Sequence, residues 1–259
     1  MSRIKEVFKR GKAFIPFITA GDPNLDKTVE YVLTMADAGA DIIEIGIPFS
    51  DPTAEGVVIQ EANIRALKAG FQMEKLFEAV AKIRETSDIP LIFMTYINPV
   101  FHYGYEAFFQ KCKELSVDGF ISPDVPFEEK AEIVDVAGKY GVDVISMVSP
   151  TSDERIAKIA SGANGFIYVV SSMGVTGVRS SISTDLGKIV GKIREVTDTP
   201  CAIGFGISTP AQAEKMAGIA DGAIVGSAIV RIVAKHGREA ARPLYEYVKE
   251  MKEAVNRAG

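Results

Sequence analysis

Short apolar segments alternate with longer amphipathic segments along the whole 259-residue chain, and this order predicts an α/β fold, a (β/α)8 TIM barrel. Eight strand-and-helix units fit the length of one barrel, and no linker, low-complexity tract or composition change marks a domain boundary. We therefore expect residues 1–259 to form a single barrel domain. A doubly wound open sheet is the alternative, but eight regular units favour closure.

Each expected strand is a short apolar run, and each expected helix is a longer stretch with amphipathic periodicity. The strands are expected at Phe14 to Thr19, Ile42 to Gly46, Leu91 to Tyr96, Gly119 to Ile121, Asp143 to Val148, Gly165 to Val170, Cys201 to Gly204 and Gly222 to Val225. The helices are expected at Asp26 to Ala38, Met73 to Glu85, Tyr105 to Leu115, Glu128 to Lys139, Ser152 to Ala160, Asp185 to Val196, Pro210 to Ala217 and Arg238 to Arg257. Extra helices are expected at the amphipathic N-terminus and at Val57 to Ala69, after the second strand.

The composition limits the classes of function. Hydrophobic residues make up 47% and charged residues 24% of the chain, as in soluble globular proteins. The net charge of −5 disfavours nucleic acid as a partner, so any bound phosphate is expected to belong to a small molecule. No apolar stretch reaches the length of a membrane span. Cys112 and Cys201 lack metal or redox spacing, which fits a cytoplasmic protein without a metal site.

The segment from Glu44 to Gly56 is the most informative part of the sequence. Strand alternation puts Ile42, Glu44 and Gly46 on one face of the second expected strand, so an acidic side chain lies in an apolar run. A buried carboxylate takes up a proton, finds a partner or faces a ligand cavity. Glu44 is therefore either one half of a core salt bridge or a functional acid, and Glu55 follows it in the next loop.

The predicted fold bears on these alternatives. In TIM barrels, ligands bind at the C-terminal ends of the strands, and residues there are more often catalytic than structural. Glu44, Tyr96, Asp124 and Tyr168 all fall near such ends in the expected strands. This placement favours a functional Glu44, and two acids at one strand end suggest proton-transfer chemistry.

Glycine-bearing turns follow the last three expected strands, at Gly174 to Gly177, Gly204 to Gly206 and Gly226-Ser227. Glycine lets backbone N–H groups approach an anion, and the helix that begins at Ser227 would direct its positive end toward it. These turns predict that the substrate carries a phosphomonoester. His102, expected in a loop, and His236, expected at a helix end, fit neither a catalytic triad nor a metal cluster.

Six ordered motifs resemble the tryptophan synthase α subunit family over nearly the whole chain. They are Pro16 to Pro23, Glu44 to Gly56 with Ile59-Gln60, Met94 to Pro99, Pro123 to Pro126, Gly174 to Gly177, and Gly204 to Ser208. The resemblance implies a (β/α)8 barrel that cleaves indole-3-glycerol phosphate to indole and glyceraldehyde 3-phosphate in a retro-aldol reaction. It also implies an α2β2 complex with a β subunit, which receives the indole for tryptophan biosynthesis.

The resemblance assigns a role to individual residues. It implies that Glu44 is the catalytic acid-base and that Glu55 holds the indole N–H. The implied substrate-binding residues are Phe17, Ile59, Tyr96 and Tyr168 around the indole, Gly177, Gly206, Gly226 and Ser227 at the phosphate, and Thr176, which couples its loop to the second acid. Pro48, Asp51 and Pro52 match the family's surface for the β subunit. No cofactor is implied here, because pyridoxal phosphate belongs to the β partner.

The sequence departs from the family pattern at the second acid. The usual residue is Asp in an Ala-Asp-Gly context, whereas this chain has Ala54-Glu55-Gly56, with Val57 where Pro is usual. The carboxylate moves outward by one methylene, and displacements on the order of 1 Å can cost roughly 10²-fold in rate. No basic residue precedes the Gly174 turn directly, so phosphate binding would depend on backbone donors or on Arg179.

Two rival hypotheses remain open at this stage. One is an α-type subunit with weak chemistry that acts mainly as an activator of the β partner, which the unusual Glu55 would explain. The other is a different phosphate-binding barrel enzyme, such as a pentose-phosphate epimerase or a phosphoribosyl isomerase. The latter does not explain the segment from Glu44 to Gln60.

Overall fold

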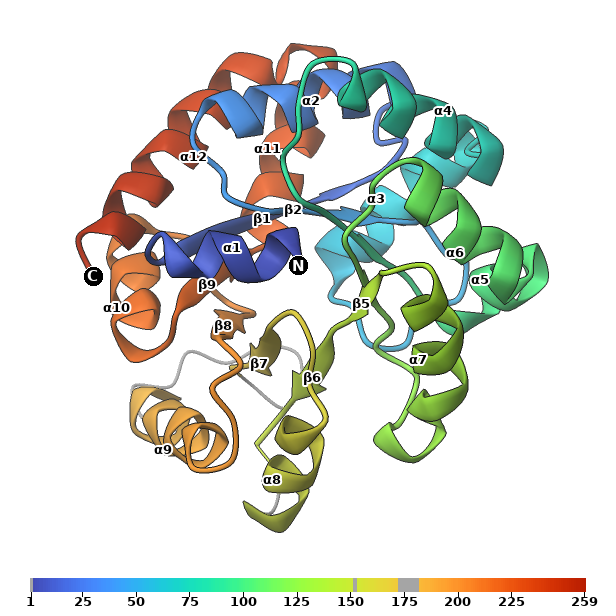
Figure 1. The fold of residues 1–259 in the computed structure, drawn as a ribbon. Helices are drawn as coiled ribbons and strands as arrows, with labels where there is room; N and C mark the ends of the chain where they lie inside the picture. The colour runs from blue at the N-terminus through green and yellow to red at the C-terminus, as the bar shows by residue number, and fades with distance from the viewer. Residues whose placement is uncertain (1, 151–152, 172–181) are drawn as a thin grey trace.

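The chain folds into a parallel barrel surrounded by helices (Figure 1). The computed structural model describes residues 2–150, 153–171 and 182–259, without the side chains of residues 182–185. The sheet order is β5-β4-β3-β2-β1-β9-β8-β7-β6, and every pairing is parallel. The strands are β1 (Ala13–Thr19), β2 (Ile43–Gly46), β3 (Leu91–Met94), β4 (Gly119–Ile121), β5 (Asp143–Val144), β6 (Ser146–Val148), β7 (Ile167–Val170), β8 (Cys201–Gly204) and β9 (Gly222–Val225). The predicted TIM barrel is confirmed.

The fifth expected strand is divided into β5 and β6 at a single residue, Ile145. β5 pairs with β4 and β6 with β7, so this stretch joins the two edges of the sheet and closes the barrel. The Ile145 N–H still donates to the Phe120 carbonyl at 2.9 Å. The Lys130 ammonium donates on both sides of the division, to the Val144 carbonyl at 2.9 Å and to Ser146 Oγ at 2.7 Å.

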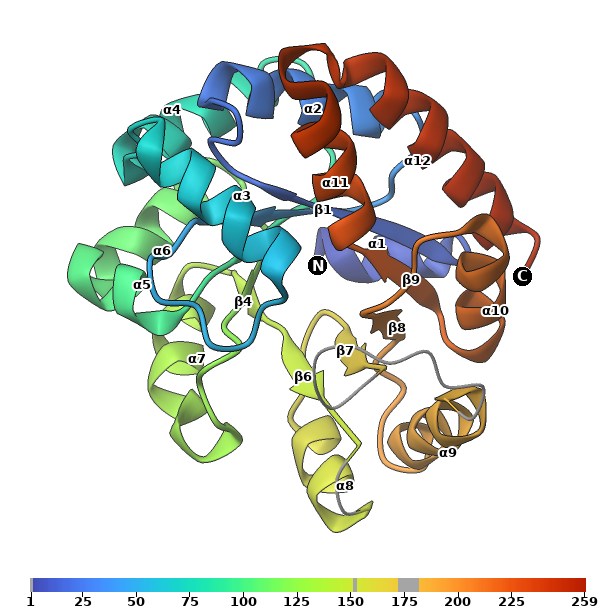
Figure 2. The same cartoon turned by 180° about the vertical axis from the view of Figure 1, so that it is seen from behind.

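Most of the helices form the outer ring of the barrel, as both face views show (Figures 1 and 2). The helices are α1 (Arg3–Lys9), α2 (Leu25–Asp37), α3 (Val57–Lys68), α4 (Met73–Arg84), α5 (Ile97–Tyr103), α6 (Tyr105–Glu114), α7 (Lys130–Lys139), α8 (Asp153–Ser161), α9 (Ile182–Arg194), α10 (Pro210–Ile219), α11 (Ser227–His236) and α12 (Ala241–Asn256). Short 3-10 turns, η1 (Phe127–Glu129) and η2 (Gly237–Glu239), precede α7 and α12. The expected extra helices are confirmed as α1 and α3.

One helix was not predicted. His102 was expected in a loop, but it lies in the last turn of α5. The segment contains Asn98-Pro99, which is typical of a turn, yet proline is also tolerated in the first turn of a helix because the N–H there has no intrahelical partner. The loop prediction for His102 is therefore wrong, whereas His236 ends α11 as expected.

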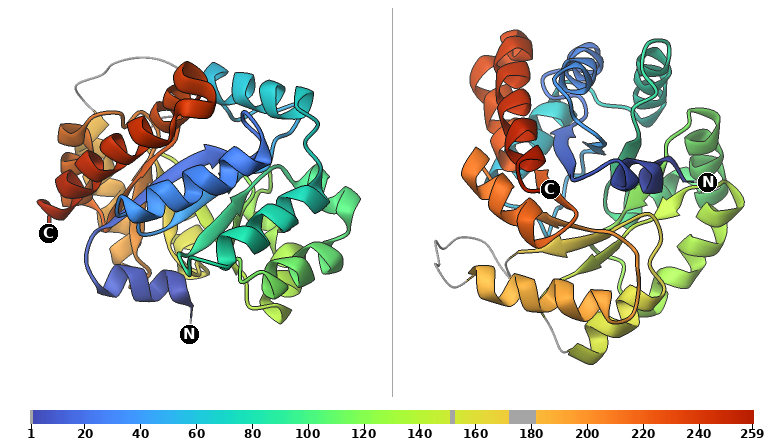
Figure 3. Two further views of the ribbon diagram at one scale, coloured as in Figure 1. Left: turned by 90° about the horizontal axis from the view of Figure 1, so that it is seen from above. Right: turned by 60° about the vertical axis from the view of Figure 1, so that its left-hand side comes forward.

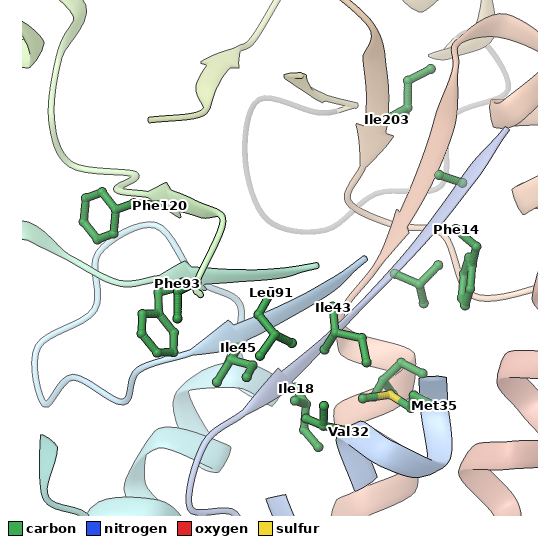
Figure 4. Close-up of a cluster of buried hydrophobic side chains, with 14 of the residues drawn as sticks. Phe14, Ile18, Val32, Met35, Ile43, Ile45, Leu91, Phe93, Phe120 and Ile203 are labelled. Atoms are coloured by element: carbon green, nitrogen blue, oxygen red, sulfur yellow. The ribbon is translucent and has the colours of Figure 1, made fainter. Parts of the chain in front are cut away.

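Side-chain alternation divides the buried residues into two layers. Ala13, Ile15 and Ile42 face the barrel interior, where Ile4 of α1 joins them. Ile43 and Ile45 face outward into the layer between strands and helices, which Figure 4 shows against α2. The alternation expected for the second strand is confirmed, because period-2 side chains must occupy opposite faces of a sheet. Consequently Glu44 points into the barrel.

Helix α1 lies across the N-terminal end of the barrel, and Figure 3 shows it alongside the strands' starting ends. Its Phe8 ring lies 5.7 Å from the Phe166 ring beneath the interior cluster. With this end covered, a site for a ligand is left to the opposite end, where TIM barrels bind their ligands. None of the described helices has the length and hydropathy of a membrane span.

Candidate active site at the barrel mouth

Glu44 lies at the barrel mouth, which we define as the C-terminal ends of the strands with their following loops. Its neighbours in strand register are Phe17 of β1 and Ile92 of β3. The side chain is 1% exposed, and Oε1 has no hydrogen-bond partner among the described residues. Burial raises the pKa of Glu44 to about 8, because a carboxylate is poorly solvated there.

The surroundings of Glu44 do not support a core salt bridge. No cation forms an ion pair with it in the described part of the chain, and burial alone accounts for its raised pKa. The pKa of the buried Tyr168 phenol is raised by burial and also by the charge of Glu44, so the two groups interact electrostatically. A buried acid without a cation is a candidate for proton transfer at neutral pH.

Two glycines make room for aromatic side chains at the mouth. A Cβ added at Gly46 would collide with the ring of Phe17, and one at Gly204 would collide with the Tyr168 phenol. Glycine weakens a strand, and its presence often marks a place where another group approaches the backbone closely. At Gly46 and Gly204 that group is an aromatic ring. Phe205 after β8 places its ring 6.2 Å from that of Tyr168, edge to face.

Helix α3 also contributes apolar side chains to the mouth. Ile59 is 9% exposed and packs in one cluster with Phe17, Ala62 and Val230 of α11. The structure therefore brings together Phe17 and Ile59, which the family resemblance places in one pocket. Their apolar surface is the kind that binds a flat aromatic ligand.

Glu55 lies just before α3 and is partly buried. The Asn63 side-chain amide donates to Glu55 Oε2 at 2.8 Å, and the Gln60 amide donates to the Glu55 carbonyl at 2.8 Å. Burial raises the pKa of Glu55 to about 7, although the Asn63 hydrogen bond opposes this. The Ala54 N–H donates to the Tyr96 hydroxyl at 2.7 Å, so Tyr96 anchors the same loop.

The chain segments that follow β8 and β9 also lie at the mouth. Phe205 and Gly206 both have left-handed backbone torsions, with φ of 73° and 76°, which turn the chain sharply after β8. Gly206 and Ser227 are exposed, and Ser227 begins α11 directly after Gly226. Free N–H groups at a helix start attract anions. Thr176, Gly177 and Arg179 lie outside the described residues.

Comparison with known protein families shows which family this chain belongs to. A family model described as "Tryptophan synthase alpha chain" matches residues 4–256. The chain belongs to this family. A tryptophan synthase alpha chain from Lacticaseibacillus casei is 50% identical over 256 residues, which cover 99% of this chain and 96% of the relative. One from Lactiplantibacillus plantarum is 51% identical over 257 residues, covering 99% and 97%.

Solved structures support the same relationship. Tryptophan synthase subunit alpha from Legionella pneumophila superposes with a TM-score of 0.89 at 35% identity, covering 99% of both chains. A chain from the tryptophan synthase α2β2 complex of Pyrococcus furiosus superposes with a TM-score of 0.84 at 33% identity, covering 94% of this chain and 99% of that one. Tryptophan synthase alpha chains catalyse the lyase half-reaction that cleaves indole-3-glycerol phosphate. This membership excludes the epimerase and isomerase hypothesis.

The three residues matched to the tryptophan synthase β-subunit surface differ in exposure. Asp51 is exposed and Pro52 is partly exposed, whereas Pro48 is buried within the chain itself. Asp51 and Pro52 are therefore accessible at the surface of this chain, and Pro48 is not.

The sequence did not predict two side-chain contacts at the barrel mouth. Asp22, after β1, is 2% exposed and accepts two hydrogen bonds from the Arg65 guanidinium, at 2.9 and 2.7 Å. Asn63 holds the Glu55 carboxylate. Helical spacing could have revealed Asn63, because it lies four residues after Ile59 and therefore on the same face of α3.

Proposed function

We propose that Glu44 and Glu55 divide the two tasks of the lyase reaction in this chain. Glu44 is the acid-base that serves both indole C3 and the glycerol hydroxyl, and Glu55 binds the indole N–H. The observation that carries this proposal is the buried Glu44 carboxyl at the mouth, whose Oε1 has no partner among the described residues and whose pKa is raised to about 8. Such an acid is protonated at neutral pH and can donate its proton.

The reaction then proceeds with balanced proton transfers. Protonated Glu44 delivers its proton to indole C3, and the positive charge that develops on the ring nitrogen is stabilised by the Glu55 carboxylate. The Glu44 carboxylate next removes the proton of the hydroxyl on the carbon attached to C3. The carbon–carbon bond breaks, its electron pair returns the ring to neutral indole, and the alkoxide becomes the aldehyde of glyceraldehyde 3-phosphate. Glu44 ends protonated, ready for another turnover.

The two raised pKa values define a pH window for this mechanism. Glu55 must start ionised, with a pKa of about 7, and Glu44 must start protonated, with a pKa of about 8. We expect a bell-shaped dependence of kcat/KM on pH, with its maximum between these values. The acid limb then reports Glu55 and the alkaline limb reports Glu44.

The remaining residues bind the substrate. We propose that Phe17, Ile59, Tyr96 and Tyr168 surround the indole, and that the phosphate binds at Gly206, Gly226 and Ser227, where the start of the ten-residue helix α11 contributes backbone donors. From the family resemblance we also assign Gly177 to the phosphate and Thr176 to coupling its loop to the second acid.

We further propose that the chain works as a single-domain cytoplasmic subunit with a tryptophan synthase β subunit in an α2β2 complex. The related structure from Pyrococcus furiosus is described as the basis of mutual activation within such a complex. The exposed Asp51 and partly exposed Pro52 would contribute to the interface. The reaction above uses only side chains of this chain, so no cofactor is assigned here, and pyridoxal phosphate is expected on the β partner.

The deciding experiment measures indole release from indole-3-glycerol phosphate by the purified chain, with and without a β subunit. We expect turnover that rises on addition of the β subunit and is abolished in Glu44→Ala while the circular dichroism spectrum is retained. Near-normal turnover in this variant would overturn the role of Glu44. If the unmodified chain releases almost no indole but still activates the β subunit, and Glu55→Asp restores release, the activator hypothesis is correct.

A further inference from the structure

Asn63 lies on the face of α3 that lines the barrel mouth. It is 3% exposed, and its amide nitrogen lies 2.8 Å from Glu55 Oε2. Ile59, one turn earlier, and Ala62 belong to the cluster with Phe17, so this face of the helix is packed in place. An amide on a helix whose face is packed can hold a carboxylate on a loop in one position, because packing fixes the amide's own rotamer.

We propose that Asn63 is a positioning residue for the second acid, and that its amide fixes the longer Glu55 side chain where the family usually has Asp. This inference rests on the proposed role of Glu55 in binding the indole N–H. Asn63 donates to Oε2, which leaves Oε1 of the same carboxylate to accept the indole N–H. The extra methylene of Glu55 is thereby held in a defined conformation.

The hydrogen bond from Asn63 to Glu55 is important for keeping Glu55 ionised. No ion pair to Glu55 is found in the described ranges, and Tyr96 is the titratable neighbour whose pKa is raised in part by Glu55. Arg65, further along α3, is already paired with Asp22. Burial therefore disfavours the Glu55 carboxylate, and the Asn63 hydrogen bond opposes that effect. Removal of the amide should leave Glu55 protonated over a wider pH range.

The first test replaces the amide with an apolar side chain of similar size. We expect Asn63→Leu to lower kcat/KM at pH 7 by roughly 10-fold and to move the acid limb of the pH profile upward by about one unit. Gln60→Leu is the matched control, since Gln60 binds the backbone carbonyl of Glu55 instead of its carboxylate. In that variant the acid limb should stay in place.

The second test moves one methylene from the acid to the amide. Glu55→Asp shortens one partner and Asn63→Gln lengthens the other, so each single variant should lose roughly 10-fold in kcat/KM. The double variant conserves the combined volume and reach, and we expect it to recover to within about 3-fold of the unmodified chain. A purely structural Asn63 would not produce this recovery together with a restored acid limb.

The outcomes separate this inference from the proposed function. All variants are assayed as full chains with the β subunit, and their melting temperatures are recorded. An unmoved acid limb in Asn63→Leu, or additive losses in the double variant, would overturn the role of Asn63 while leaving the lyase assignment intact. If Glu44→Gln and Glu55→Gln both retain turnover, the proposed function itself fails.

Discussion

Three acids at the N-terminal end of the barrel and two acids at its mouth differ in their partners. At the N-terminal rim, which we define by Asp41, Asp118 and Asp221, each carboxylate accepts a backbone N–H from the strand that precedes it in sequence and pairs with a cation. At the mouth, Glu44 and Glu55 have no cation among the described residues. The difference shows which acids hold the fold and which are available for chemistry.

Each acid at the N-terminal rim is paired with a cation from another part of the chain. Lys252 donates to Asp41 at 2.7 Å, Arg3 to Asp118 at 2.6 Å, and Arg194 to Asp221 at 3.1 Å. Burial raises the pKa of Asp118 as well, but Arg3 opposes this through a hydrogen bond and its charge. Each of these three acids is thus held by a backbone donor and a cation, which fits a role in the fold.

The largest expected effect is a contrast in catalysis between the two ends. Glu44→Gln keeps the shape of the side chain but removes the acidic carboxyl proton, so kcat/KM should fall by about 10²- to 10⁴-fold. Asp118→Asn at the rim should leave kcat/KM within about 2-fold, measured well below its unfolding temperature. Comparable losses in the two variants would show that the ends are not functionally distinct.

The same two substitutions should change stability with opposite signs. The folded pKa of Glu44, about 8, exceeds its ordinary value of 4.5, so its contribution to stability is present below about pH 4.5 and is lost as the pH rises through 8. Glu44→Gln should therefore raise stability by on the order of 3 kcal/mol at pH 9 and by little at pH 4. Asp118→Asn should lower it by about 2–4 kcal/mol at neutral pH. Urea unfolding at several pH values measures both changes.

Two glycines offer a matched steric comparison. An added Cβ at Gly222, near the strand starts, would lie 2.7 Å from the Ala13 carbonyl oxygen, and this backbone atom cannot move aside. Gly222→Ala should cost about 1–3 kcal/mol with activity retained. Gly46→Ala meets the ring of Phe17, which is buried against Ile59, so we expect a similar cost of about 1–3 kcal/mol together with roughly 10-fold lower kcat/KM. Thermal melts and indole assays would expose any reversal of this pattern.

The smallest effect is expected at an exposed ion pair of the rim. The Arg194 side chain is 52% exposed where it contacts Asp221, so solvent weakens the interaction. Arg194→Ala should lower the free energy of unfolding by at most about 1 kcal/mol and leave kcat/KM unchanged. A larger loss would mean that the rim depends on cations more than on backbone donors.

Most of the barrel could be predicted because local periodicity reports local structure. The strands repeat apolar patterns and the helices repeat amphipathic patterns. The predictions were wrong where one pattern fits two structures. Asn98-Pro99 was interpreted as a turn but lies in the first turn of α5. The fifth strand was expected to be continuous, whereas it is divided at Ile145, next to the contacts of Lys130. Such a contact between distant segments leaves no local signature.

The candidate site was likewise predictable from the sequence only in part. Strand alternation and motif order identified Glu44 and Glu55, because residue type and spacing are properties of the sequence. Whether Glu44 would be paired or unpaired, and that Asn63 would hold Glu55, depended on which groups from other elements lie beside them. By itself, the sequence determined the repeating architecture, the family and the acids. Only the tertiary structure decided their protonation and partners, because desolvation and hydrogen bonding arise when distant segments pack together.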